Sequence, residues 1–298
     1  MAFRKGKVHD IGNFQDRQDS DQETLNRLQC NRFQSKPLVQ WLSYFLAGAK
    51  AIMKLLLLGT TGYHPNDRRQ TACLMLPELG VLLDAGSAMY RVSVYLKTDT
   101  LDIFLTHAHL DHVMGLTFLF DVLNDHDIPQ VTVHGEPEKL AAIRKHLFSK
   151  LLFPVEPSFK SSPLAPKITL VDGGVLTHFP LKHPGGSVGY RIDWPERSFA
   201  YVTDTVATPD ANYVQKIHGV DLLIHECYFE DTMPEQAELT GHSCLTPVAQ
   251  VAAAAEVGRM VLVHINPLLA NDEDLNLSAA RKIFPRIEIG QDRMELDF

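Results

Sequence analysis

The chain has 298 residues, 45% of them apolar, so it can bury a large core in one large domain or two modest ones. Its formal charge of −8 provides no global basic field, so a charged substrate has to be held locally. The four cysteines are scattered without a CxxC pair, which is typical of a reducing compartment, and we expect a cytoplasmic protein. No run of 18 apolar residues occurs and the first 29 residues are polar, so we expect neither a membrane span nor a secretory signal.

The first part of the chain differs in composition from the rest. Residues 1–36 are rich in Asp, Gln, Arg and Asn and lack periodicity, which predicts a flexible extension. The apolar stretch 37–53 predicts a helix that packs on the body or contacts a membrane surface. Met53 leaves open that the working start of the protein lies there. We therefore predict a partly flexible N-terminal extension over 1–52 and one folded domain over 53–298.

The folded domain begins with the apolar run MKLLLLG, which predicts a first strand that ends at the turn Gly59–Gly62. Further strands are predicted at 72–76, 80–84, 101–106, 130–134, 168–171, 188–193, 198–203, 221–225, 260–264 and 286–297. Helical patterns lie at about 112–124, 136–150, 207–217, 246–257 and 277–283. Early strands follow one another and later strands alternate with helices, so we expect an α/β (α+β) fold of two sheets packed face to face, with helices outside.

The stretch FLTHAHLDHVMG (104–115) gathers four metal-ligand side chains directly behind an apolar strand. They are His107, His109, Asp111 and His112. Imidazole and carboxylate groups suit zinc, and also iron or manganese. Four ligands at this spacing do not easily serve one tetrahedral ion, so the motif favours two adjacent ions over one ion or over a solvated polar loop.

Two ions need further ligands, and three candidates lie at other strand ends. His183 precedes a strand beside two glycines, Asp204 ends the strand FAYVTDT, and His264 ends the strand MVLVH. Taken singly, each has a plainer explanation as a cap or a solvated residue. Because all three lie at the same kind of position, on rigid sheet, we predict that they complete the site and that Asp204 bridges the ions.

The HxHxDH motif together with these three residues resembles the metallo-β-lactamase superfamily. Within it, the chain is similar to the ribonuclease Z (tRNase Z) branch over residues 53–298. The motifs LLLLGTTGYHP, VLLDAGSA, HECYFED, TGHSCLTPVAQVAAAAEVGRMVLVHINP and DRMELDF occur in the order of that family. The resemblance implies a four-layer αβ/βα sandwich of two mixed β-sheets flanked by helices, and a possible homodimer. It also implies that His107, His109 and His183 hold one ion, that Asp111, His112 and His264 hold the other, and that Asp204 bridges them.

The resemblance further implies a proton-donating pair. The family's HEAT element corresponds to His225-Glu226-Cys227-Tyr228 and its HST element to His242-Ser243-Cys244, so the pair is Glu226 and His242. Two divalent ions, most simply zinc, would provide a bridging hydroxide near neutral pH, with Asp111 steering the water and His242 protonating the leaving oxygen. This inventory fits a phosphodiesterase that acts on RNA 3′ ends or on small or cyclic phosphodiesters.

One interval departs from the tRNA-cutting members. Only 21 positions separate His183 from Asp204, where those members carry a long arm that grips tRNA, and here one hairpin turning at Pro195-Glu196 fits. The bridging aspartate also lies in TDT rather than the commoner GDT. The substrate size therefore stays open. The alternatives are a thioester or β-lactam hydrolase of the same superfamily and a non-catalytic metal-binding protein; a redox role is disfavoured because His109 stands where the diiron branch has an acidic residue.

Overall fold

The structure is a computed structural model that describes residues 53–298 except 125, 127, 129, 156, 270 and 272–274. The predicted extension and nearly all of the predicted helix 37–53 lie outside the described residues. Among the described residues, no helix has both the length and the apolar character needed to cross a bilayer.

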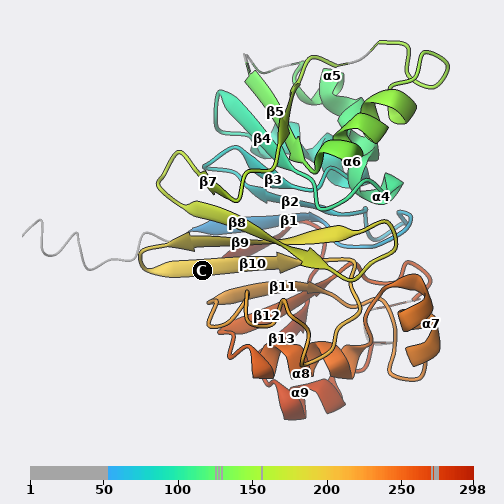
Figure 1. Ribbon diagram of the computed structural model, residues 1–298, viewed down its shortest axis with the longest axis vertical. Coiled ribbons are helices and arrows are strands. Elements are labelled where there is room, and N and C mark those ends of the chain that lie inside the picture. Colours follow the sequence, from blue (N-terminus) through green and yellow to red (C-terminus); the bar gives the residue numbers. More distant parts are fainter. Residues whose placement is uncertain are drawn as a thin grey trace, which may run out of the picture. The chain divides into compact units, whose positions relative to one another are not determined.

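Two seven-stranded sheets form the body of the described domain (Figure 1). The first sheet has the order β14-β1-β2-β3-β4-β5-β6, with the bounds β14 Met294–Asp297, β1 Lys54–Gly59, β2 Cys73–Leu76, β3 Val81–Leu83, β4 Thr100–Phe104, β5 Gln130–Gly135 and β6 Lys160–Pro163. The second sheet has the order β13-β12-β11-β10-β9-β8-β7, with the bounds β13 Ile287–Ile289, β12 Arg259–Val263, β11 Leu222–Glu226, β10 Arg197–Val202, β9 Ser187–Trp194, β8 Val175–Leu181 and β7 Lys167–Thr169.

The two sheets share one pattern of strand pairing. In the first, β14, β1, β2 and β3 pair antiparallel, and β3, β4, β5 and β6 pair parallel. In the second, β7 to β10 pair antiparallel and β10 to β13 pair parallel. The prediction of two mixed sheets is therefore confirmed. Parallel strands end together at one edge of a sheet, and that edge is where open α/β sheets bind ligands.

Helices cover the outer face of each sheet, as Figure 1 shows for α4 to α6 and for α8 and α9. The helical segments are η1 Ser87–Arg91, α3 Val92–Tyr95, α4 Leu110–Val113, η2 Met114–Phe118, α5 Leu119–Val122, α6 Pro137–Ala142, the π-helical η3 Ile143–Leu147, α7 Pro234–Thr240, α8 Leu245–Ala254 and α9 Ser278–Ile283. The resulting order is helices, sheet, sheet, helices, which is the predicted four-layer sandwich.

The leucine run of β1 shows why the chain layers in this way. Leu55 and Leu57 lie in the cluster between the sheets, and Leu56 and Leu58 lie in the cluster under the helices of the first sheet. Alternate side chains of a strand point to opposite faces, so a continuous apolar run requires both faces to be covered. The stretch LLLL therefore specifies a strand in an inner layer, with about 1.5–3 kcal/mol from each buried leucine.

Two predicted elements are wrong. Residues 207–217 are not a helix but a series of turns, with backbone bonds such as Val214 N–H to Ala211 O, and the apolar side chains of this segment pack on the second sheet all the same. The predicted strand 286–297 is two strands, β13 and β14, which belong to different sheets. A turn separates them, in which Arg293 has a φ of 67°.

Five elements were not predicted: the strands β6 and β8, and the short helical segments η1, α3 and α7. β8 reads VLTHFPL and β6 reads KSSP, so polar residues and proline break the alternation that indicates a strand. The short hairpin was predicted correctly. β9 and β10 pair directly, with Trp194 opposite Arg197 across the Pro195-Glu196 turn, so no arm lies between His183 and Asp204.

Candidate metal centre

The candidate ligands lie where strands of both sheets end, and the backbone turns sharply there. Asp84 follows β3, Asp204 lies just past β10 and His264 follows β12, and their φ angles are 61°, 53° and 54°. Residues other than glycine rarely adopt this left-handed conformation, which costs about 1–3 kcal/mol at each position. Such strain concentrates at functional sites. Here it aims three polar side chains toward one region between the sheet ends.

One group of donor atoms comes from His107, His109, His183 and Asp204, which offer atoms within 4.8 Å of one another. The Nε2 atom of His183 lies 3.2 Å from Nδ1 of His109 and 3.5 Å from Oδ2 of Asp204. The Nε2 atom of His107 lies 3.5 Å from the same carboxylate oxygen. Three imidazole nitrogens and one carboxylate oxygen therefore converge on one point.

The second group comes from Asp111, His112 and His264, again within 4.8 Å. The Nε2 atoms of His112 and His264 lie 3.2 and 3.3 Å from Oδ1 of Asp204. They also lie 3.4 and 3.3 Å from Oδ2 of Asp111. Asp204 thus turns one oxygen toward each group, which is the geometry expected of a bridging ligand.

The chemistry of these groups fits divalent cations. The Nε2 atom of His107 is buried and has no hydrogen-bond partner among the described residues. Burial lowers the pKa of His107, and the charge on His112 lowers it further, so this imidazole is neutral and its lone pair is available. Around His112, burial is outweighed by the carboxylates of Asp204, Asp111 and Asp84, which raise the pKa of this imidazole well above its ordinary value. An excess of negative charge that favours a proton also favours a metal ion.

Hydrogen bonds behind the candidate ligands orient them. Asp84 is fully buried and accepts from Nδ1 of His112 at 2.8 Å, from the Thr106 N–H at 2.8 Å and from the Tyr201 hydroxyl at 3.0 Å. Nδ1 of His183 donates to the Gly241 carbonyl at 2.9 Å. Such partners fix the imidazole tautomer and leave Nε2 free to bind. Sequence reasoning missed Asp84, although its place at the end of the apolar run VLLD resembles the places of Asp204 and His264.

The turn after β1 supports the second group from the other side. A Cβ atom on Gly62 would lie 2.1 Å from Cε1 of His264, so only glycine lets the imidazole occupy its place. The backbone N–H of Tyr63 donates to Oδ2 of Asp111 at 2.8 Å, and Tyr63 itself has a φ of 61°.

The predicted proton-donating pair lies beside both groups. Nδ1 of His242 lies 3.1 Å from Oε1 of Glu226, and the His242 ring centroid is 5.1 Å from those of His183 and His264. Glu226 is fully buried and is held by the backbone N–H groups of Thr205 at 2.7 Å and Ser243 at 3.2 Å. Burial by itself would lower the pKa of His242. The charge of Glu226 and its hydrogen bond to the ring outweigh this effect and raise the pKa from 6.5 to about 9.

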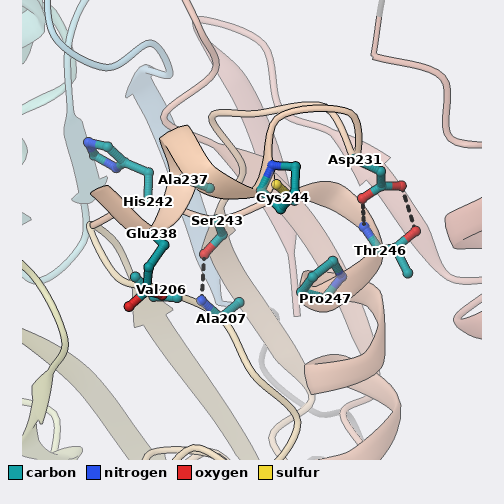
Figure 2. A pocket seen from close by; sticks show the side chains of 11 residues that line it. Val206, Ala207, Asp231, Ala237, Glu238, His242, Ser243, Cys244, Thr246 and Pro247 are labelled. Carbon is teal, nitrogen blue, oxygen red and sulfur yellow. Dashed lines mark hydrogen bonds between the residues drawn. The ribbon is translucent and has the colours of Figure 1, made fainter. Parts of the chain in front are cut away.

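The loop that carries His242 is fixed through its neighbour. The Ser243 hydroxyl donates to the Thr205 carbonyl at 2.7 Å and accepts from the Ala207 N–H at 3.0 Å, which ties this loop to the segment after Asp204. Figure 2 shows the hydrogen bond between Ala207 and Ser243 in the wall of a cavity, whose volume is about 420 Å³. The ring of His242 points away from the other labelled side chains of that cavity, and it lies beside the ring of the candidate ligand His264. The cavity therefore borders the loop that carries His242.

Comparison with known proteins agrees with this architecture. Residues 81–265 match the model of the beta-lactamase superfamily domain, which is more than half of the chain, and the chain belongs to that superfamily. Similar sequences are the ribonuclease Z of Metallosphaera sedula, 27% identical over 81% of this chain and 97% of that one, and the ribonuclease Z of Trichodesmium erythraeum, 28% identical over 80% and 94%. The predicted resemblance to ribonuclease Z is confirmed.

Solved structures show the same fold. The metallo-beta-lactamase fold protein YhfI of Bacillus subtilis is 20% identical, with a TM-score of 0.69 over 83% of this chain and all of that chain. A diphosphatase of the PhnP family is 22% identical, with a TM-score of 0.64 over 83% and 97%. The short form of human tRNase Z is 22% identical, with a TM-score of 0.63 over 82% and 98%. The metallo-β-lactamase sandwich is therefore confirmed for this chain.

Proposed function

We propose that this protein is a metal-dependent phosphodiesterase that holds two divalent cations, most simply zinc. The observation that carries the proposal is the Glu226–His242 pair, in which a buried carboxylate holds a proton donor beside the two converging ligand groups. A thioester releases a thiolate that leaves readily without a proton, whereas departure of an alkoxide from phosphorus needs a proton donor. The pair therefore favours a phosphodiester over a thioester, and the similarity to proteins named ribonuclease Z favours it over a β-lactam.

The two groups around Asp204 would each hold one cation. One cation would be bound by His107, His109 and His183, and the other by Asp111, His112 and His264. Cations bound there would lower the pKa of a shared water toward about 7 and neutralise charge on the phosphoryl oxygens. The mixed imidazole and carboxylate donors suit zinc, and also manganese or iron.

The side chains of this chain then supply the proton transfers. His242 holds a proton on the nitrogen that faces the ligand groups while Glu226 accepts from its Nδ1, so it can protonate the departing oxygen. Asp111 stays ionised, because although burial raises its pKa the charges of His112 and His264 lower it well below its usual range. Its carboxylate, oriented by the Tyr63 N–H, can accept a hydrogen bond from the attacking water.

The substrate is proposed from the relatives and from the short hairpin. The similar sequences are named ribonuclease Z, and one structural neighbour is a diphosphatase. With only the β9–β10 hairpin between His183 and Asp204, the site fits the end of an RNA chain or a small or cyclic phosphodiester. A cytoplasmic location, a homodimer and the separation of residues 1–52 from the catalytic domain remain proposals.

The test is an activity panel on metal-loaded full-length protein. We expect hydrolysis of bis-p-nitrophenyl phosphate, and of 2′,3′-cyclic nucleotides or a 3′-extended pre-tRNA, with an Asp204→Ala variant inactive on all of them. Turnover of a glutathione thioester without turnover of any phosphodiester would contradict the proposal. Metal binding without either activity would support a non-catalytic metal-binding protein instead.

A further inference from the structure

Tyr228 lies between the proton-donating pair and the second ligand group. It follows β11 by two residues, and its N–H donates to the Ser243 carbonyl at 3.2 Å, which fixes its backbone against the His242 loop. Its ring is stacked on His242, with centroids 5.0 Å apart and planes 22° apart, and lies 5.8 Å from the ring of His264. The tyrosine is therefore held by backbone and ring on two sides.

The Tyr228 hydroxyl has no hydrogen-bond partner among the described residues, although its ring is half-buried. Other buried tyrosines of the sandwich are satisfied. Tyr190 donates to the Leu105 carbonyl at 2.6 Å, Tyr201 donates to Asp84 at 3.0 Å, and Tyr213 pairs with Nε2 of His225 at 3.0 Å. The Tyr228 hydroxyl is not one of the fully buried polar atoms, so it is open to solvent and therefore to a bound ligand.

The rings beside Tyr228 show which region it borders. It is stacked on His242, whose ring centroid lies 5.1 Å from those of His183 and His264, and its own ring also lies beside that of His264. Tyr228 therefore lines the same region as His242, from the neighbouring position.

We propose that the Tyr228 hydroxyl donates a hydrogen bond to a phosphoryl oxygen of the bound substrate, an inference that rests on the proposed phosphodiesterase function. A phosphoryl oxygen of a diester accepts hydrogen bonds but cannot donate them, and the tyrosine hydroxyl is a donor near neutral pH. Stacking on His242 places this donor next to the group that protonates the leaving oxygen. Tyr228 would hold the phosphoryl group while His242 acts on the ester oxygen.

Two substitutions separate the hydroxyl from the ring. Tyr228→Phe removes only the hydroxyl and keeps the stacking on His242, whereas Tyr228→Leu removes both. We expect Tyr228→Phe to lower kcat/KM for bis-p-nitrophenyl phosphate about 10- to 100-fold, the usual loss for one donor to a charged group. The affinity of the metal-loaded protein for inorganic phosphate, measured by calorimetry, should fall about tenfold. Bound metal and the unfolding temperature should not change.

A matched control is Tyr90→Phe. Tyr90 lies on η1, is 48% exposed, and its hydroxyl accepts a hydrogen bond from Arg91. Removal of this hydroxyl should leave turnover and phosphate affinity unchanged. Wild-type affinity for phosphate in Tyr228→Phe would overturn the inference, as would loss of metal in that variant. If the wild type hydrolyses no phosphodiester, the proposed function fails. The phosphate titration then still decides whether Tyr228 contacts a phosphoryl oxygen.

Discussion

The Nδ1 atom of His112 donates to the buried carboxylate of Asp84 across 2.8 Å, and this contact leaves Nε2 of the imidazole directed at Asp111 and Asp204. A carboxylate in this position fixes the tautomer and makes the imidazole a stronger ligand. We expect Asp84→Asn to weaken metal affinity or activity about 10- to 100-fold. The amide can turn its N–H toward the ring, and it then no longer holds the proton of the imidazole on Nδ1. Titration of the metal-free protein with zinc measures this change.

The chain provides a matched control for that substitution. Nε2 of His134 pairs with Oδ1 of Asp102 at 2.7 Å, a contact of the same kind on β5 and β4 of the first sheet, and neither residue is a candidate ligand. Asp102→Asn should leave metal affinity unchanged. Equal losses in Asp84→Asn and Asp102→Asn would show that the effect reports stability rather than ligand orientation.

Removing the proton donor should matter most for poor leaving groups. In His242→Ala, hydrolysis of a diester with an alkoxide leaving group should fall about 10²–10⁴-fold, because the oxygen leaves without a proton. p-Nitrophenolate is a stable anion, so hydrolysis of bis-p-nitrophenyl phosphate should fall much less. Comparing kcat for the two substrates tests the assignment, and equal losses would argue that His242 serves the site in another way.

The pH profile should report the same residue. The pKa of His242 is raised from 6.5 to about 9, chiefly by Glu226 against the effect of burial, so the donor form is present below that pH and is lost as pH rises through it. For alkoxide leaving groups, kcat should therefore decline above about pH 9. Glu226→Gln removes the charge that raises the pKa, so the decline should begin at lower pH. An unchanged alkaline limb in this variant would exclude His242 as its source.

The glycine beneath His264 offers a test of the second ligand group. In Gly62→Ala the new Cβ would lie 2.1 Å from the ring, so the imidazole must shift and the protein should lose one of its two proposed cations. Elemental analysis of bound metal measures this loss. Gly173→Ala is the control, because that site has open space and a φ of 90°, so it tests backbone strain alone. It should reduce stability by about 1 kcal/mol and leave the metal content unchanged.

The positions of the ligands could be predicted because each follows or precedes an apolar run that forms a buried strand. His107, Asp204 and His264 lie at such ends, and the ends of parallel strands meet. Asp84 and Tyr228 were not predicted as part of the site. Asp84 ends an apolar run as Asp204 and His264 do, but the sequence does not show which strand-end residue holds a ligand from behind, and the loop position of Tyr228 carries no local signal.

The wrong helix at 207–217 has a related cause. Tyr213, Val214 and Ile217 are spaced as on a helical face, and all three are buried against the second sheet. This spacing matches the side chains that pack inward, but a series of turns, most of them closed by i to i−3 bonds, meets the same requirement. Packing on a sheet face constrains which residues are inside more tightly than it constrains the local backbone.

The candidate ligands are divided between the two sheets: His107 to His112 follow β4, and His183, Asp204 and His264 belong to the second sheet. A nascent polypeptide therefore cannot assemble the complete centre until the strand before His264 has been synthesised and the two halves have docked. Ions bound at that stage would link segments more than 70 positions apart in the chain. Removal of the metal should therefore also make the protein unfold faster.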